Sequence, residues 1–142
     1  MANKKILIVD DDPDVLQGLH VRLKANHYDT FFATDALAAM TEARKREPDL
    51  IILDLGLPAG DGFVVMERLR AFPALAVIPI IVVSARDARA NKERAIKAGA
   101  RVYLQKPVDN EKLLAAIRKV LGDPEVNEEK ASVVYDLGTI KG

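Results

Sequence analysis

Short runs of apolar residues alternate along the chain with longer segments in which apolar residues recur at helical spacing. Residues 6–9, 50–53 and 80–83 are apolar at every position, which is typical of strands covered on both faces of a parallel sheet. Residues 28–33 and 102–104 predict two further strands, the first of them more exposed. The pattern therefore predicts an α/β fold with a doubly wound, five-stranded parallel sheet and helices on both faces.

The segments between and after these strands predict helices, with recognisable start and stop signals. Asp12, followed by Pro13, and Asp35 are expected N-caps, because a carboxylate accepts hydrogen bonds from the first N–H groups of a helix. Pro48 disfavours helical geometry in the residue before it, so the second helix should stop at Glu47. The expected helices cover about residues 13–26, 36–47, 63–72, 88–98 and 111–121, the last capped by Asp109 or Asn110,.

The length and composition of the chain restrict the classes of protein to which it can belong. The chain has 142 residues, of which 49% are apolar and 30% charged, and this predicts one globular domain over residues 1–122 with a tail over residues 123–142. Lys and Arg number 21, as do Asp and Glu, so we expect no direct nucleic-acid binding. No apolar run approaches the ~20 residues of a membrane span, and we expect a cytoplasmic protein. Cysteine is absent, so a metal would need oxygen or histidine ligands.

Polar residues with complementary chemistry follow four of the predicted strands. They are Asp10, Asp11 and Asp12 after the first strand, Asp54 after the third, Ser84 after the fourth and Lys106 after the fifth. Ligands of open α/β sheets bind beyond the carboxyl ends of the strands. We therefore expect several carboxylates, a hydroxyl and an ammonium to meet in one pocket.

That set of groups predicts a metal-assisted phosphoryl site. Carboxylates held close together repel one another, and a hard divalent cation bound through oxygen relieves the repulsion. Mg²⁺ is the expected ion, because it needs only one or two carboxylates and keeps water or phosphoryl oxygens in its other positions. Lys106 and Ser84 would bind the phosphoryl oxygens that the metal leaves uncovered.

Four stretches of the sequence resemble the receiver domain of two-component response regulators: residues 6–12, 54–62, 83–85 and 103–107. The resemblance covers roughly residues 4–122. It implies the flavodoxin-like strand order 2-1-3-4-5, for which a chemotaxis receiver is a known example. It also implies a partner, either a sensor histidine kinase or a phosphotransfer protein, whose phosphohistidine supplies the phosphoryl group.

Carried over to matching positions, the resemblance gives the acidic residues their roles. Asp54 would be the phosphoacceptor nucleophile and also a metal ligand. Asp11 would bind Mg²⁺ directly, Asp10 through water, and Gly56 through its backbone carbonyl. Gly56 and Arg86 would also tune hydrolysis of the phosphoryl aspartate. The chain would thus be a switch that catalyses its own phosphorylation and dephosphorylation, and not an enzyme with a separate substrate.

The same resemblance assigns the ends of the fourth and fifth strands. The Ser84 hydroxyl would turn toward the phosphoryl group. Tyr103 stands at the switch aromatic of the family and would move inward as that hydroxyl is recruited. Lys106 would contact the phosphoryl oxygens, and the bond that follows it, to Pro107, would be cis.

Several of these residues also have a purely structural interpretation. Asp12 is expected to cap a helix rather than bind metal. Ser84 could cap the turn that follows its strand, and Tyr103 could be a packed strand residue with a solvated hydroxyl. For the two aspartates before Asp12 the metal role is favoured, because the other strand ends supply matching groups.

Two regions carry hypotheses about partners. Residues 88–121 cover the surface that changes on phosphorylation in the family, and their many charges allow a homodimer, although a solvated face is the simpler interpretation. Residues 123–142 combine an acidic linker with apolar residues between 133 and 140. This tail could dock on the domain, form a dimer arm, or lead to an output domain.

Two other functions would use part of this set of chemical groups. A phosphohydrolase with an aspartyl nucleophile would use the same carboxylates, Mg²⁺ and lysine. Such enzymes usually carry an acid two residues after the nucleophile, where this chain has Gly56. A pure interaction module with an unused pocket is the third possibility, and the complete set of chemical groups disfavours it.

Overall fold

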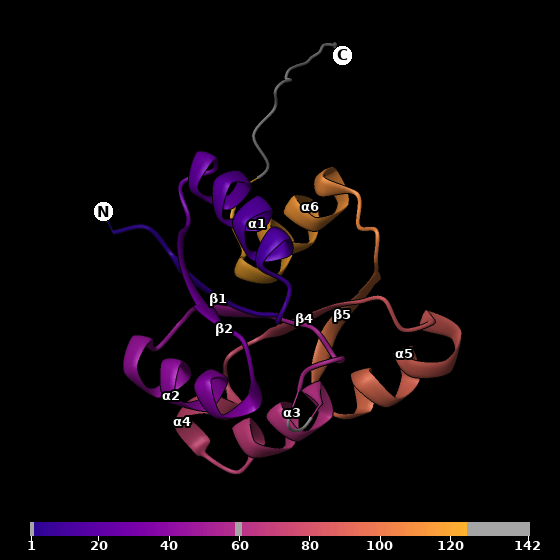
Figure 1. Cartoon of the computed structure of the whole chain (residues 1–142). Helices are drawn as coiled ribbons and strands as arrows, with labels where there is room; N and C mark the ends of the chain where they lie inside the picture. The colour runs from indigo at the N-terminus through magenta and orange to yellow at the C-terminus, as the bar shows by residue number, and fades with distance from the viewer. Residues whose placement is uncertain (1, 59–60, 125–142) are drawn as a thin grey trace.

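The computed structural model describes residues 2–58 and 61–124, and a five-stranded parallel sheet lies at its centre (Figure 1). The strands are β1 (Lys5–Val9), β2 (Asp29–Ala33), β3 (Leu50–Leu53), β4 (Ile80–Ser84) and β5 (Ala100–Gln105). Their order is β2-β1-β3-β4-β5, and every pairing is parallel. The predicted doubly wound fold and the strand order 2-1-3-4-5 are confirmed.

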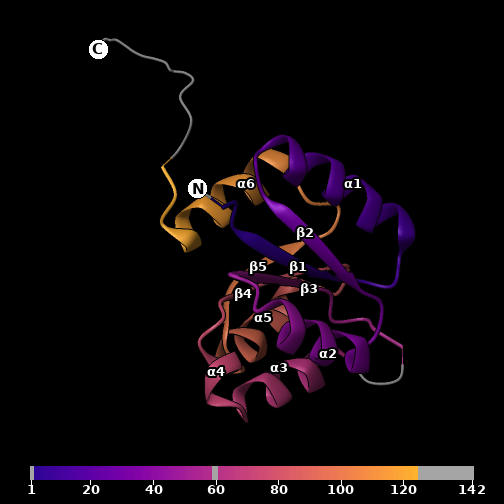
Figure 2. The same cartoon turned by 90° about the vertical axis from the view of Figure 1, so that its left-hand side faces the viewer.

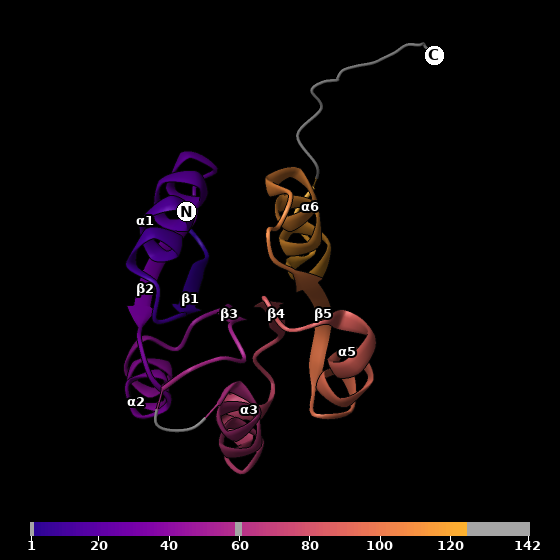
Figure 3. The ribbon, with the colours of Figure 1, turned by 45° about the vertical axis from the view of Figure 1, so that its right-hand side comes forward.

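Helices cover both faces of the sheet. One face carries α1 (Pro13–Ala25) and α6 (Asn110–Leu121), and the other carries α2 (Ala36–Arg46), α3 (Gly62–Arg70), α4 (Pro73–Ala76) and α5 (Ala88–Lys97) (Figure 1, Figure 2). In Figure 3 the row of strands from β2 to β5 separates these two layers. Within residues 2–58 and 61–124, no helix combines the length and the apolar character needed to cross a membrane.

The central strands supply side chains to two separate cores. Ile6 and Ile8 of β1 belong to the core beneath α1 and α6, whereas Leu7 and Val9 belong to the core on the opposite face. All four side chains are 0% exposed. This explains why β1 is apolar at every position, since alternate residues of a strand point to opposite faces.

The predicted helix starts agree with the structure. Asp12 and Asp35 accept hydrogen bonds from N–H groups in the first turns of α1 and α2. Asp109 caps α6, and Asn110 is the first helical residue. The capping role favoured for Asp12 is therefore confirmed.

The segment between α3 and β4 differs from the prediction. The expected helix over residues 63–72 ends at Arg70, and the single turn α4 follows it. Pro73 at the first position of α4 is compatible with a helix start, but Phe72 before it makes no side-chain capping bond, so the pattern gave little sign of a new helix. β5 also begins at Ala100, two residues earlier than expected, next to a shift in its register with β4.

Asp123 links the end of α6 to the start of the sheet through an ion pair and a hydrogen bond. Lys4 Nζ lies 2.6 Å from Asp123 Oδ1 and 3.0 Å from the Leu121 carbonyl, and the Tyr28 hydroxyl donates to Asp123 Oδ2 at 2.9 Å. Burial alone would raise the pKa of Asp123, but the hydrogen bonds from Lys4 and Tyr28 outweigh burial and lower this pKa. Of the tail, only Asp123 and Pro124 are described, so the roles predicted for the rest lie outside the described residues.

This cluster predicts a loss of stability in alkaline solution. Burial, followed by the hydrogen bond to Asp123, raises the pKa of Tyr28 from 10.0 to about 12. A raised folded-state pKa gives stability that is full below pH 10.0 and is lost as the pH rises toward about 12,. Near pH 11.5 the loss should reach ~2 kcal/mol relative to Tyr28→Phe, which cannot ionise. Urea unfolding of the wild-type and Tyr28→Phe chains across this pH range measures the loss. Free energies of unfolding that fall in parallel with pH in the two chains would contradict the prediction.

Candidate functional site

The polar residues at the strand ends meet at the carboxyl edge of the sheet, as expected, although Ser84 is the last residue of β4 and does not follow it. Backbone hydrogen bonds beyond the strand pairs fix them there. Asp54 N donates to the Val9 carbonyl at 2.9 Å, and Lys106 N donates to the Ser84 carbonyl at 2.8 Å. The positions of these residues are therefore set by the sheet itself.

Asp10, Asp11 and Asp54 form an acidic cluster. One carboxylate oxygen from each lies within 4.8 Å of the others. Asp10 is 3% exposed and Asp54 8% exposed, whereas Asp11 is exposed to solvent. Three oxygen donors, two buried and one open to water, suit a hard cation that keeps part of its hydration shell. The chemistry of the donor set thus fits Mg²⁺.

Lys106 places a positive charge directly against this cluster. Its Nζ lies 2.8 Å from Asp10 Oδ2 and 3.6 Å from Asp54 Oδ2. Burial alone would lower the pKa of Lys106, but the hydrogen bond to Asp10 and the charges of Asp10 and Asp54 outweigh burial and raise this pKa. The ammonium therefore stays charged at neutral pH, beside the carboxylate expected to carry phosphate.

Backbone groups hold the two buried carboxylates in place. Asp12 N donates to Asp10 Oδ1 at 2.9 Å, and Gly56 N lies 3.3 Å from Asp54 Oδ1. A Cβ at Gly56 would meet Asp54 Oδ2 at 3.9 Å, which is ordinary contact, so this position could carry a side chain. Gly56 is thus placed beside Asp54, and its carbonyl as a metal ligand stays a prediction.

Ser84 and Tyr103 both bond to the loop between β4 and α5. Ser84 is 1% exposed, and its Oγ accepts a hydrogen bond from Arg86 N at 3.2 Å, so the local capping interpretation of this side chain is correct in the structure. Tyr103 is 7% exposed and donates its hydroxyl to the Arg86 carbonyl at 2.8 Å. Burial raises the pKa of Tyr103 above its ordinary value. The ring already occupies an inward position in this structure, and its movement stays a prediction.

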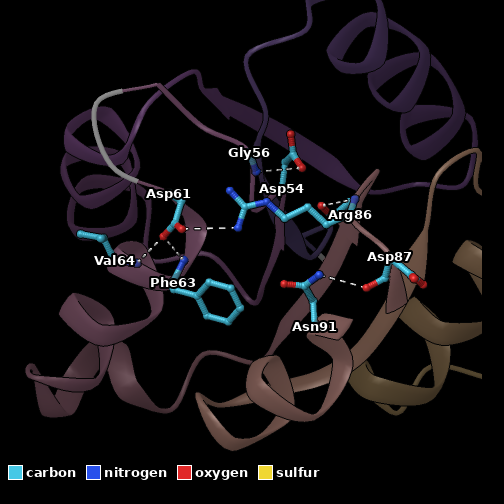
Figure 4. Close-up of polar contacts among 9 residues, drawn as sticks. Asp54, Gly56, Asp61, Phe63, Val64, Arg86, Asp87 and Asn91 are labelled. Atoms are coloured by element: carbon cyan, nitrogen blue, oxygen red, sulfur yellow. Dashed lines mark hydrogen bonds and ion pairs between the residues drawn. The ribbon is translucent and has the colours of Figure 1, made fainter. Parts of the chain in front are cut away.

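The peptide bond between Lys106 and Pro107 is cis, as the resemblance implied. Arg86 was expected only to influence hydrolysis, and the structure adds a specific partner. Its Nη1 lies 3.4 Å from Asp61 Oδ2 (Figure 4). Sequence reasoning missed Asp61, although an Asp before Gly62 and an apolar helical run is a recognisable cap signal.

Comparison with known proteins supports the same family. The model of the response regulator receiver domain matches residues 6–118. The chain is 39% identical over 117 residues to the DNA-binding dual master transcriptional regulator RpaA of Synechocystis, covering 82% of this chain and 48% of RpaA. It is 40% identical over 116 residues to the KDP operon transcriptional regulatory protein KdpE of Escherichia coli, covering 82% of this chain and 50% of KdpE. The chain therefore spans about half the length of these relatives or less.

Solved structures agree with this result. A response regulator from Chloroflexus aurantiacus superposes with a TM-score of 0.80 at 31% identity, covering 84% of this chain and 98% of that one. The receiver domain of the sensor histidine kinase PA1611 from Pseudomonas aeruginosa, solved with a magnesium ion coordinated in its active-site cleft, gives a TM-score of 0.78 at 27% identity, covering 86% and 100%. The chain belongs to the response regulator receiver domain family.

Proposed function

We propose that this receiver domain accepts a phosphoryl group on Asp54, in a Mg²⁺-dependent transfer from the phosphohistidine of a sensor kinase or phosphotransfer protein. The observation that carries the proposal is the convergence of three carboxylates and one ammonium. Asp10, Asp11 and Asp54 offer oxygens within 4.8 Å of one another, and Lys106 Nζ lies 3.6 Å from Asp54. An aspartyl phosphohydrolase would use the same groups, but this chain has Gly56 where such enzymes usually carry an acid.

The residues have separable tasks in this transfer. An oxygen of Asp54 attacks phosphorus, and the bond to the donor nitrogen breaks as that nitrogen keeps the electron pair. Lys106 would neutralise phosphoryl oxygens, and Ser84 would offer its hydroxyl after leaving Arg86 N. Asp11, Asp54 and the Gly56 carbonyl, with Asp10 acting through water, would hold Mg²⁺, which would supply charge neutralisation at the site.

We also propose that the reaction is a modification of the chain itself, in the cytoplasm, with no separate substrate turned over. The magnesium ion in the PA1611 receiver supports the choice of metal. RpaA is described as DNA-binding, and KdpE as a transcriptional regulatory protein. The output of the present chain would lie in binding to a partner or a second copy through residues 88–121 when Ser84 and Tyr103 respond.

Intact-mass measurement after incubation with acetyl phosphate and Mg²⁺ tests the proposal. We expect a single phosphoryl adduct on the wild-type chain and none on Asp54→Asn, which keeps the size of the side chain but lacks the nucleophilic carboxylate. Chelation of Mg²⁺ should remove the adduct as well. An unmodified wild-type chain would contradict the proposal, and sustained turnover of varied phosphate esters would favour the phosphohydrolase instead.

A further inference from the structure

Arg86 connects three side chains at the start of the loop between β4 and α5. Its N–H donates to Ser84 Oγ at 3.2 Å, and its carbonyl accepts from the Tyr103 hydroxyl at 2.8 Å. Its guanidinium Nη1 lies 3.4 Å from Asp61 Oδ2. Ser84 and Tyr103 are the side chains proposed to respond to phosphorylation. The position of this one residue therefore decides whether both keep their present hydrogen bonds.

Asp61, which faces the Arg86 guanidinium, is itself held in place by hydrogen bonds. Its Oδ1 accepts hydrogen bonds from Phe63 N at 3.0 Å and Val64 N at 3.4 Å, which caps α3, and its Oδ2 is left to face Arg86. Figure 4 shows the Arg86 side chain extending from the end of β4 toward Asp61, with the capping bonds on the other side of the carboxylate. The cap holds Asp61 in place, so the ion pair restrains the loop that carries Arg86 and not the start of α3.

Two further arginines link α3 to α5. The guanidinium carbon of Arg94 in α5 lies 3.7 Å from the centroid of the Phe63 ring at the start of α3. Arg70 of α3 also donates to the Lys97 carbonyl at the end of α5, at 3.2 Å. Long cationic side chains therefore link α3 to α5 and its preceding loop. Among these contacts, the pair of Asp61 and Arg86 acts directly on the partner of Tyr103.

The Arg86 carbonyl is a hydrogen-bond acceptor for the Tyr103 hydroxyl in its buried position. A phenol hydroxyl removed from water needs a hydrogen-bond acceptor, and an unmade bond in a buried site is costly. If the loop shifts, the hydroxyl loses the Arg86 carbonyl, and the exposed position of the ring gains population. The side chains of Arg86 and Asp61 are 38% and 31% exposed, so the pair is weak and sensitive to salt. Such a pair can shift the equilibrium between the buried and exposed positions of the Tyr103 ring, but it is too weak to hold the ring in one position.

We propose that Asp61 and Arg86 are positioning residues that set the balance between buried and exposed states of the Tyr103 ring. Loss of the ion pair should lower the ratio of buried to exposed ring about 1.5- to 5-fold, which is the range an exposed pair can sustain. The inference rests on the proposed function only where it treats Tyr103 as a switch. The proposed balance does not require a phosphoryl group, so it is measured on the unphosphorylated chain.

Fluorine NMR of the full chain labelled with 3-fluorotyrosine tests this inference. The chain has three tyrosines, and Tyr103→Phe assigns the relevant resonance. Arg86→Gln and Asp61→Asn should each move it toward the position of a solvent-exposed tyrosine, and the double variant should move it no further. Asparagine is also a good N-cap, so Asp61→Asn removes the charge while α3 keeps its cap. Arg86→Lys, which keeps the charge, should return the resonance toward its wild-type position.

Glu93→Gln is the matched control. It breaks another exposed pair, in which Lys97 Nζ lies 3.2 Å from Glu93 Oε2 on α5, and it should leave the Tyr103 resonance unmoved. High salt should reproduce the shift in the wild-type chain and not in Arg86→Gln, which keeps the test valid if a variant fails to fold. A resonance that responds neither to the substitutions nor to salt overturns the inference, as does a response to Arg86→Gln without one to Asp61→Asn. No phosphoryl donor is present, so failure here is separate from failure of Asp54 to be phosphorylated.

Discussion

Replacing Gly62 by alanine should destabilise the domain by about 3 kcal/mol and slow phosphorylation of Asp54. A Cβ at Gly62 would lie 2.6 Å from the backbone oxygen of Asp54 and 2.9 Å from Leu55 Cα. Both are backbone atoms, so neither can swing aside as a flexible side chain would. Gly62 N also donates to the Leu55 carbonyl at 2.9 Å, which places the start of α3 directly against the end of β3. The added methyl group therefore pushes α3 away from the segment that carries the phosphoacceptor.

Gly18→Ala provides the control for this substitution. Gly18 lies within α1, and a Cβ there would meet nothing within 4 Å. Alanine should stabilise that helix by about 0.5–1 kcal/mol, because glycine loses more backbone freedom on folding. Urea unfolding followed by circular dichroism compares the two variants, and acetyl phosphate labelling of the folded fraction gives the rate at Asp54. A Gly62→Ala chain as stable as the wild type would show that α3 can move freely at its start.

The parts of the fold predicted correctly depend on local patterns. The unbroken apolar run at residues 6–9 indicated a central strand, and the carboxylates of Asp12 and Asp35 indicated helix starts. Each signal is contained within a few neighbouring residues. The single turn α4 has no such signal, because Phe72 has no capping side chain and the turn is too short to show a helical period. The early start of β5 depends on its register with β4, which no local pattern encodes.

The candidate site was predictable because topology determines which residues meet. In a parallel sheet the residues after each strand gather at one edge, so Asp10, Asp54 and Lys106 could be grouped without knowing any distance. The pair of Arg86 and Asp61 could not be found in this way, since Asp61 precedes α3 and does not directly follow a strand. Their contact depends on how a long side chain crosses between two loops. The inward position of Tyr103 likewise follows from the placement of its acceptor, the Arg86 carbonyl, and not from sequence pattern.

Replacing Lys106 by methionine should slow phosphorylation of Asp54 about 10²- to 10³-fold, the usual effect of removing one preorganised donor to a developing charge. Lys106 Nζ lies 3.6 Å from Asp54 Oδ2 and its raised pKa keeps it charged at neutral pH, so it is the cation already beside the attacking carboxylate. Methionine fills similar space but offers neither charge nor hydrogen bond. Lys112→Met, at an exposed position on α6, should leave the rate unchanged.

The same substitution should have the opposite effect on metal binding. Lys106 now neutralises part of the acidic cluster, with Nζ 2.8 Å from Asp10 Oδ2, and a bound cation must compete with that charge. Without the ammonium the carboxylates of Asp10, Asp11 and Asp54 repel one another more strongly, so Mg²⁺ should bind more tightly. The rise of the thermal midpoint with Mg²⁺ concentration measures this affinity. Slower phosphorylation with tighter Mg²⁺ binding separates loss of a phosphoryl contact from general loss of structure, which would weaken both. A Lys106→Met chain labelled at the wild-type rate would contradict the role of this lysine in the transfer.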